Sequence, residues 1–435
     1  MSTDEVVLRK GVYRDSVTLM RISKTLADLD GVEVAVVAMA TPLNLDLARD
    51  LGFELPAADP ADLLVAVRGQ RAAAAHAELD ALLSAHAPVA AADSDQPPLT
   101  TRSAARRTEA GVVLVSVPGE HAFAEAVDAV EAGLPVMVFS DGVPLEQEVA
   151  LKDLAAEKGV LVMGPDCGTA VIAGVGLGFA NVLRPGPVGI VAASGTGAQQ
   201  LSCLLDLAGV GVSHVLGVGG RDLSPEVGGR SANRALAMLD EDPATELIVL
   251  VSKQPAVRPA VPAKRFVEAS ADLTATAERV LKELGRAVPE WPAWPAWAGR
   301  TATGTLRGIY SGGTLCAEAK GVAGTGEFVD YGDDAYTRGR PHPMIDPTLR
   351  LEALAAVAEG DVVLMDVVLG HGADPDPAAS YAHAVARCPA TVVVALIGSE
   401  GDPQDLRRQA AAFREAGAAV FTSNAQAARH ARSLL

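Results

Sequence analysis

The sequence predicts an α/β protein built from three doubly wound parallel-sheet domains of the Rossmann or flavodoxin-like kind. Short apolar runs alternate with amphipathic helical patterns along most of the chain. The turns after these runs are rich in glycine, as expected where a strand leads into a helix. The chain has 435 residues, 49% of them hydrophobic, which is enough to bury several cores. We expect domains at residues 1–182, 186–286 and 302–435.

The first domain is predicted from its β-α repetition. Apolar runs such as Val34–Met39 and Leu63–Val67 alternate with helical patterns such as that of residues 71–85. This alternation is typical of a parallel sheet. The stretch 90–108 is polar and contains proline, so we expect a loop there. The alternation resumes at Val112–Val117, so residues 1–182 are predicted to form one interrupted unit.

The second domain is predicted to begin with a strand at 189–193 and a helix at 198–209. Its last apolar run is Glu246–Val251. The following segment, 256–265, is short and broken by proline, which leaves no room for the further helix and strand of a full doubly wound domain.

Residues 287–301 are predicted to link the second and third domains. Trp291, Trp294 and Trp297 recur every third residue among prolines. This pattern is typical of a polyproline-like linker laid on a surface, and an aromatic docking site is the alternative. From residue 302 onward the alternation of strands and helices repeats to the end.

Composition excludes several classes of partner. The net charge of −18 argues against nucleic acid and anionic membranes. Four isolated cysteines lack C-x-x-C spacing, so neither a zinc site nor a disulfide framework is indicated. The start lacks a signal sequence, and no apolar run approaches the length of a membrane span. We therefore expect a soluble protein of the cytoplasm.

The turn between residues 193 and 198 is the main candidate site. Ser194, Gly195, Thr196 and Gly197 lie between a predicted strand and a predicted helix, where free backbone N–H groups can bind an anion. The alternative is a turn that is only capped by Ser194 or Thr196. A second strand-glycine-helix turn is predicted at Gly370, His371 and Gly372.

Other candidate residues follow predicted strands, where ligands bind in sheets of this kind. They form three loops and one later carboxylate: Gly164, Pro165, Asp166 and Cys167; Gly219, Gly220 and Arg221; Gly312, Gly313 and Thr314; and Asp346. Cys167 is either a packed thiol or a nucleophile. The irregular stretch 330–347 is dense in Asp, Arg, Tyr and His, which favours chemistry over a merely solvated loop.

The histidines do not form a metal site by their spacing. His342 and His371 lie in different loops, and no two histidines share a helix face. Each is interpreted as a donor to an anion or as an acid–base group, with a structural histidine as the alternative.

Several of these motifs resemble a known family. The runs 164–168, 189–196, 218–220 and 242–246 resemble the α subunit of succinyl-CoA synthetase at the same mutual distances, and the last third is similar to the CoA-ligase domain of its β subunit. The FdrA family is resembled from about residue 6 to the C-terminus, through short motifs that occur in the same order. These motifs are residues 10–11, 40–42, 251–253, 310–315 and 339–347. The resemblance makes the first domain CoA-binding-like and the second and third ligase-like.

The resemblance implies acyl-phosphate chemistry. In the synthetases two helix starts hold a phosphoryl group. The resemblance implies that the corresponding residues here are Ser194, Gly195 and Thr196 at one start and Gly370, His371 and Gly372 at the other. The phosphohistidine segment of the synthetases would fall near 256–275, where this chain has no histidine, and no ATP-grasp portion is present.

FdrA-like proteins are associated with ureide (allantoin) degradation, as one subunit of an oxamate carbamoyltransferase that works with two other kinds of subunit. The resemblance therefore implies a transferase oligomer with phosphate or carbamoyl phosphate as substrate. We expect Arg338 or Arg340 to bind the substrate carboxylate and His342 to act as donor or acid. An acyl-CoA synthetase subunit that binds CoA and a non-catalytic scaffold are the alternatives, and a role for magnesium is left open.

Overall fold

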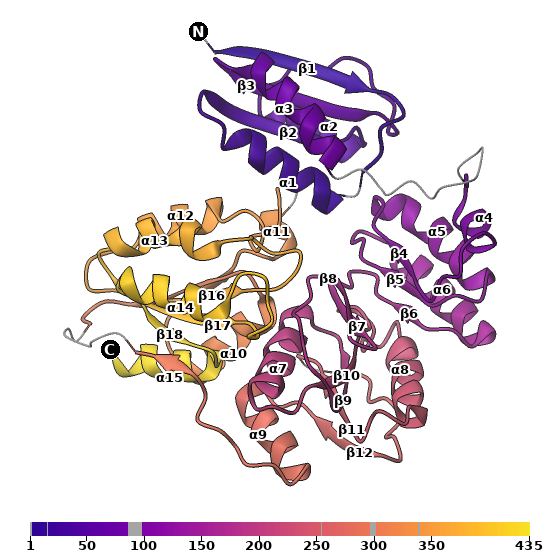
Figure 1. The fold of residues 1–435 in the computed structure, drawn as a ribbon, viewed down its shortest axis with the longest axis vertical. Coiled ribbons are helices and arrows are strands. Elements are labelled where there is room, and N and C mark those ends of the chain that lie inside the picture. Colours follow the sequence, from indigo (N-terminus) through magenta and orange to yellow (C-terminus); the bar gives the residue numbers. More distant parts are fainter. Residues whose placement is uncertain (1, 15, 86–97, 254, 296–301, 338–339) are drawn as a thin grey trace.

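The computed structural model describes residues 2–14, 16–85, 98–253, 255–295, 302–337 and 340–435 (Figure 1). They form four lobes: a first lobe (2–85), a second lobe (98–163), a third lobe (169–285) and a fourth lobe (302–435). None of the described helices has the length and apolar character needed to cross a membrane.

The first lobe has a three-stranded sheet in the order β1-β3-β2. β3 runs antiparallel to both neighbours. Helices α1 and α3 pack on one face of the sheet, and α2 packs on the other. The elements are β1 (Thr3–Arg9), α1 (Ser16–Ala27), β2 (Val32–Met39), α2 (Pro42–Asp50), β3 (Leu63–Gly69) and α3 (Ala72–Ala85).

The expectation of one parallel unit over residues 1–182 is therefore wrong. The β-α order is as predicted, but the third strand inserts between the first two and runs the opposite way. Alternation along the chain does not determine the order of strands in a sheet, so an antiparallel insertion gives the same pattern.

The second lobe has a three-stranded parallel sheet of its own, in the order β4-β5-β6. Its elements are α4 (Thr101–Ala105), β4 (Val113–Val115), α5 (Gly119–Glu131), β5 (Val136–Val138), α6 (Leu145–Lys158) and β6 (Val162–Met163). Part of the predicted loop 90–108 is thus the short helix α4.

The third lobe is a six-stranded sheet in the order β12-β11-β9-β10-β7-β8. β9 to β12 are parallel, and the hairpin β7-β8 adds an antiparallel edge. Residues 169–178 therefore belong to this sheet and not to the first domain. The strand predicted to be missing is present as β12, although the described residues between β11 and β12 contain no helix. The elements are β7 (Thr169–Ile172), β8 (Val175–Gly178), β9 (Pro185–Ala192), α7 (Gly195–Leu207), β10 (Val212–Gly217), α8 (Arg230–Glu241), β11 (Leu247–Val251), β12 (Arg265–Glu268) and α9 (Leu273–Glu283).

The fourth lobe has the flavodoxin-like order β15-β14-β16-β17-β18, with β13 added at the edge. Its strands are β13 (Ala293–Trp294), β14 (Leu306–Tyr310), β15 (Glu327–Asp330), β16 (Val362–Val368), β17 (Thr391–Ile397) and β18 (Ala419–Phe421). Its helices are α10 (Gly313–Ala323), α11 (Asp334–Thr337), α12 (Thr348–Ala355), α13 (Pro377–Arg387), α14 (Leu406–Glu415) and α15 (Asn424–Ser433).

The tryptophan-proline segment is more than a linker. Trp291 is buried, and its Nε1–H donates to Glu278 at 3.2 Å. Trp294 lies in β13, which pairs with β18 in an antiparallel sense. Trp297 lies outside the described residues. Two of the three tryptophans therefore fasten this segment to the third and fourth lobes.

The third and fourth lobes lie side by side and share one apolar core (Figure 1). Leu201 and Leu204 of α7 and Leu315 and Ala319 of α10 belong to it. Buried polar contacts also cross the boundary, since the Gln200 side chain exchanges hydrogen bonds with the backbone of residues 422 and 424. This packing fixes the start of α7 relative to the start of α10.

Candidate functional site

A cavity of about 1070 Å³ opens where the four lobes meet. Its walls include Arg14 of the first lobe, Ser140 of the second, Ser194 of the third and Thr314 of the fourth. Its volume is at the upper end of the range for small-molecule sites, and the lobes bring polar groups and helix ends into it.

Two helix starts meet at one end of this cavity. The Ser194 and Thr314 hydroxyl oxygens are 2.6 Å apart and share a hydrogen bond. The packing is reciprocal. A Cβ on Gly312 would lie 2.6 Å from Thr196 Oγ1, and a Cβ on Gly197 would lie 3.0 Å from Thr314 Cγ2. Glycine is therefore required on both sides for α7 and α10 to approach this closely.

This meeting of helix starts creates a positive local potential. Each start carries a partial positive charge and backbone N–H groups that the helix itself does not use. The Ser194 hydroxyl accepts from Gly197 N at 3.1 Å, and no side chain caps α10. Placing two positive ends together is unfavourable unless an anion lies between them.

Lys253 and Asp330 flank the start of α10, and the sequence did not single them out as site residues. A Cβ on Gly313 would lie 2.7 Å from Lys253 Nζ and 2.5 Å from Asp330 Oδ2. Burial, with Asp366 nearby, raises the pKa of Asp330. Both residues stand at the carboxyl ends of parallel strands, which is the signal that could have identified them.

A buried ion pair supports the loop before α10. Asp366 Oδ1 accepts hydrogen bonds from the Ser311 backbone N–H at 2.8 Å and from the Ser311 hydroxyl at 3.0 Å. Arg350 pairs with the same carboxylate oxygen at 3.0 Å. Burial raises the pKa of Asp366, and the Arg350 guanidinium opposes this rise. The pair thus holds the Ser311 turn in one position.

His342 lines the cavity in its neutral form. Burial, together with the Arg350 charge, lowers its pKa to about 4. Its Nδ1 accepts the Met344 backbone N–H at 3.2 Å, so the proton of the neutral ring is on Nε2. The ring packs against Phe179 with centroids 5.8 Å apart. This arrangement favours a hydrogen-bond donor over an acid at neutral pH.

Asp166 projects into the cavity from the loop after β6. Its side chain is exposed to the cavity, where desolvation by the surrounding protein, with Asp141 and Asp334 nearby, raises its pKa to about 6. Gly164 and Pro165 are buried and do not line the cavity. Cys167 lines the cavity but is buried, and burial raises its pKa to about 12. Its thiol contacts Thr169 O at 3.5 Å. These facts favour the packed thiol over the nucleophile.

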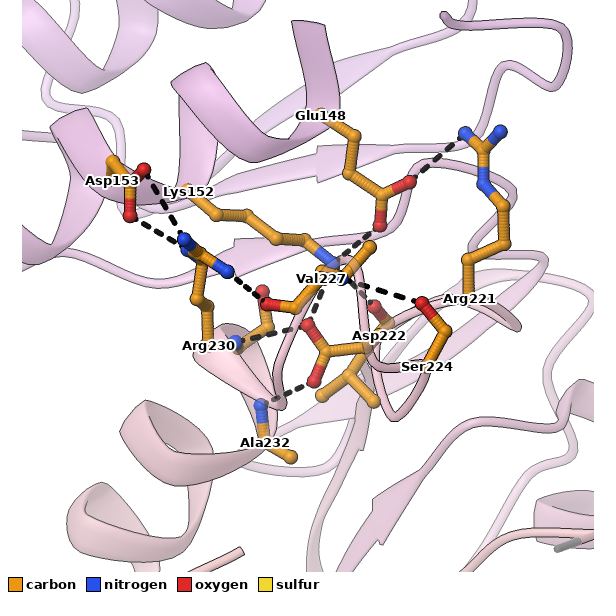
Figure 2. A network of polar contacts seen from close by, with 11 residues as sticks. Glu148, Lys152, Asp153, Arg221, Asp222, Ser224, Val227, Arg230 and Ala232 are labelled. Atoms are coloured by element: carbon orange, nitrogen blue, oxygen red, sulfur yellow. Dashed lines mark hydrogen bonds and ion pairs between the residues drawn. The ribbon is translucent and has the colours of Figure 1, made fainter. Parts of the chain in front are cut away.

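The loop 219–221 is held by buried charges (Figure 2). Lys152 Nζ donates to Glu148 at 2.7 Å, to Asp222 at 2.8 Å and to Val218 O at 3.1 Å. Arg221 pairs with the other Glu148 oxygen at 2.9 Å and does not line the cavity. Gly219 and Gly220 do line it. The predicted loop therefore divides into two cavity residues and one anchoring arginine.

The second predicted anion turn, Gly370, His371 and Gly372, is not brought into the cavity. α13 begins only at Pro377 and is capped by Asp376. Residue 371 instead forms a bridge with Ala180, and none of the three lines the cavity. The His371 backbone groups join the third and fourth lobes, whereas the Gly370 backbone bonds to Gln404 within the fourth lobe. The helix start that meets α7 is that of α10, which contains the predicted residues Gly312, Gly313 and Thr314.

The charged stretch 330–347 is only partly in the site. Arg340 lines the cavity. Asp346 does not, because its carboxylate accepts from the Thr348 N–H at 3.0 Å and from the Thr348 hydroxyl at 2.6 Å. Arg338 lies outside the described residues. Within the part of the chain that the structure describes, no three His, Cys, Asp or Glu residues are grouped to hold a metal.

Two family models match the chain. One, described as "AllF, heavy metal-associated domain", matches residues 1–98, and the other, described as "CoA-ligase", matches residues 309–434. The second match coincides with the fourth lobe, including the start of α10.

Curated relatives match different shares of the chain. The protein YahF of Escherichia coli K12 is 34% identical over 99% of this chain and 98% of its own length. The ADP-forming succinate–CoA ligase subunit alpha 2 of Archaeoglobus fulgidus is 29% identical over 35% of this chain and 54% of its own length. This chain thus spans about half of that ligase subunit.

A solved structure matches more weakly. It is the dinucleotide-forming acetyl-coenzyme A synthetase 1 of Ca. Korarchaeum cryptofilum in complex with phosphate and ADP. Its sequence identity is 15%, with a TM-score of 0.29 over 75% of this chain and 82% of that one.

Proposed function

The chain belongs to the FdrA family and is related to the CoA ligases, and from this premise we propose that it holds the phosphoryl group in acyl-phosphate or carbamoyl-phosphate chemistry. The observation that carries the proposal is the meeting of the α7 and α10 starts at Ser194 and Thr314. A phosphoryl group at the two helix starts relieves the repulsion between their positive ends and accepts hydrogen bonds from the unused N–H groups.

The reaction proposed is phosphorolysis of oxalurate, as the association of FdrA-like proteins with ureide breakdown implies. A phosphate oxygen attacks the carbamoyl carbon and forms a new C–O bond. The C–N bond to the oxamate part then breaks, and the leaving nitrogen takes up a proton. The products are carbamoyl phosphate and oxamate.

The cavity residues suit the roles that this step requires. Lys253 balances charge on the attacking phosphate at the start of α10. The neutral His342 donates from Nε2 to the oxyanion that develops on the carbamoyl oxygen. Asp166, with a pKa of about 6, supplies the proton for the leaving nitrogen. Arg340 binds the substrate carboxylate.

We further propose that the chain works in an oligomer with two other kinds of transferase subunit. The four free cysteines support a reducing, cytoplasmic setting. Magnesium is given no role in this scheme, since the proposed charges on phosphate are met by helix starts and Lys253.

The test is an assay of carbamoyl phosphate formation from oxalurate and phosphate by the complex co-expressed with its partner subunits. We expect turnover in the wild type and at least a hundredfold loss in Gly313→Val, whose side chain would occupy the space beside Lys253. His371→Ala is the control, because His371 is exposed and outside the cavity. Turnover that does not depend on phosphate, or turnover in Gly313→Val equal to that of the wild type, contradicts the proposal.

A CoA-dependent acyl-CoA ligase subunit is the second candidate, and the CoA-ligase match favours it. Titration calorimetry with CoA separates the two, because the ligase requires CoA to bind and the phosphorolysis does not. A chain that binds neither phosphate nor CoA would be a scaffold for its partners.

A further inference from the structure

The first lobe matches a model described as a heavy metal-associated domain, but its residues do not fit a heavy metal. Soft metals are held by thiolates and imidazoles. All four cysteines of the chain lie at or beyond residue 167. His76 faces Glu5, with Nε2 3.5 Å from the carboxylate, and His86 lies outside the described residues. The donor set needed for a thiolate site is therefore lacking in residues 1–98.

The loop between β1 and α1 instead places the guanidinium of Arg14 at the cavity. Arg14 lines the cavity, as does the neighbouring Tyr13. The Arg14 guanidinium donates to two backbone carbonyls, Tyr13 O at 2.7 Å and Leu83 O at 3.2 Å. Both acceptors are uncharged. Among the described residues no carboxylate pairs with Arg14, and its buried Nε has no partner.

The same loop is fixed to the second lobe. The Tyr13 hydroxyl donates to Ser116 O at 3.4 Å, at the carboxyl end of β4. Because ligands bind at the carboxyl ends of parallel strands, this contact places the loop over the ligand side of the second lobe. Figure 1 shows α1, which follows the loop, on the side of the first lobe that faces the other lobes.

We propose that the first lobe is a cover for the cavity and not a metal carrier, and that Arg14 forms a second anion subsite for the carboxylate or phosphate end of an extended ligand. The cavity volume of about 1070 Å³ is far larger than phosphate alone requires. An anion held at the α7 and α10 starts and a second anionic group held at Arg14 would use both ends of this space. The inference rests on the proposed function for the first anion but not for the identity of the second.

Binding titrations on the full chain test the subsite with three probes: inorganic phosphate, oxamate as a carboxylate, and CoA as a larger polyphosphate. We expect Arg14→Ala to change phosphate affinity less than twofold and to weaken either oxamate or CoA at least tenfold. Arg14→Lys, which keeps the charge, should recover part of that loss. Lys10→Ala is the matched control, since Lys10 is exposed in the same loop and does not line the cavity.

The outcomes distinguish this inference from the proposed function. An Arg14 effect on CoA alone supports the subsite and contradicts oxalurate phosphorolysis. An effect on oxamate alone supports the subsite and the phosphorolysis, with Arg14 in place of Arg340 as the partner of the substrate carboxylate. Arg14→Ala with wild-type affinity for both probes, or a wild type that binds neither, overturns the subsite. Unchanged phosphate binding in Arg14→Ala also shows that the variant is folded.

Amide hydrogen exchange measured with and without Zn²⁺ or Cu⁺ tests whether the first lobe binds a metal. We expect neither metal to slow exchange in residues 2–85, and His76→Ala to behave as the wild type does. Metal-dependent protection of the first lobe that is lost in His76→Ala would overturn the inference.

Discussion

Ser194 and Thr314, which are 120 residues apart in the chain, share a hydrogen bond of 2.6 Å between the starts of two helices from different lobes. Because Ser194 caps α7 and Thr314 lies in the first turn of α10, the two hydroxyls mark the position of the proposed phosphoryl group. This relationship can be tested without knowledge of the full substrate.

Thr314→Val removes one hydroxyl and keeps the shape of the side chain. We expect phosphate affinity to fall about tenfold, since one hydrogen bond to a charged group contributes about 1.5 kcal/mol or more. Phosphorus NMR or calorimetry measures the change, and His371→Ala should retain wild-type affinity. Equal affinity in Thr314→Val would place the anion elsewhere in the cavity.

Lys253→Met removes the ammonium group beside Gly313. Phosphate affinity should fall about tenfold, and its salt dependence should become weaker, because a screened charge is lost. Lys282→Met is a matched control, as Lys282 is exposed in the last turn of α9 and does not line the cavity. A salt dependence that is the same in both variants would exclude a direct role for Lys253.

Asp166 predicts a pH dependence of turnover. Its pKa is raised to about 6, and the proposed role requires the protonated form. The rate should therefore be constant below pH 6 and fall up to tenfold per pH unit above it. In Asp166→Asn the rate should be low and this limb of the pH profile should be absent. A rate that increases through pH 6 instead would assign Asp166 as a base.

Lys152→Met tests the buried network of Figure 2. Removing the ammonium leaves the buried Glu148 and Asp222 carboxylates without their shared partner. We expect a loss of about 3–5 kcal/mol in the free energy of unfolding, measured by denaturant titration. Lys158→Met, in the same helix α6 as Lys152, breaks a partly exposed pair with Glu131 of α5 and should cost less than about 1 kcal/mol. Similar losses in the two variants would show that the network adds nothing beyond a surface pair.

Glu318 predicts a pH dependence of stability. It lies between the third and fourth lobes, where it accepts from the Leu273 N–H at 2.6 Å and from Asn424 at 2.8 Å. Burial raises its pKa from 4.5 to about 7. The folded state therefore holds this proton more tightly than the unfolded state, so its contribution to stability declines as the pH rises from about 4.5 to about 7.

Denaturant titrations of the wild type and of Glu318→Gln between pH 4.5 and 8 measure this contribution. The variant cannot titrate at this position, so the difference in free energy of unfolding should change across that range and level off above pH 7. A difference that stays constant with pH would show that Glu318 has a similar pKa in both states.

The sequence predicts the parallel sheets of the third and fourth lobes well, because buried strands such as Leu247–Val251 are continuous apolar runs between polar segments. It does not predict the first lobe, since the order β1-β3-β2 depends on which strand pairs with which. The hairpin β7-β8 shows the same limit, because it follows the second lobe in the chain but joins the sheet of the third.

The candidate site, too, is predicted from the sequence only in part. The turn at Ser194 is recognisable from its glycines and its place between strand and helix, and so is the turn at Gly312. Which second turn faces Ser194 is a question of packing between lobes, and Gly370 has the same local appearance as Gly312. Lys253 follows a predicted strand, but its place beside Gly313 is known only once β11 and α10 are placed together.

The starts of α7 and α10 belong to one polypeptide. The segment that connects their lobes is fastened to the last sheet by Trp294 in β13. Assembly of the anion site is then an intramolecular event with a fixed one-to-one ratio of its halves. Dilution cannot separate them, and the affinity of the site for its anion should be independent of protein concentration.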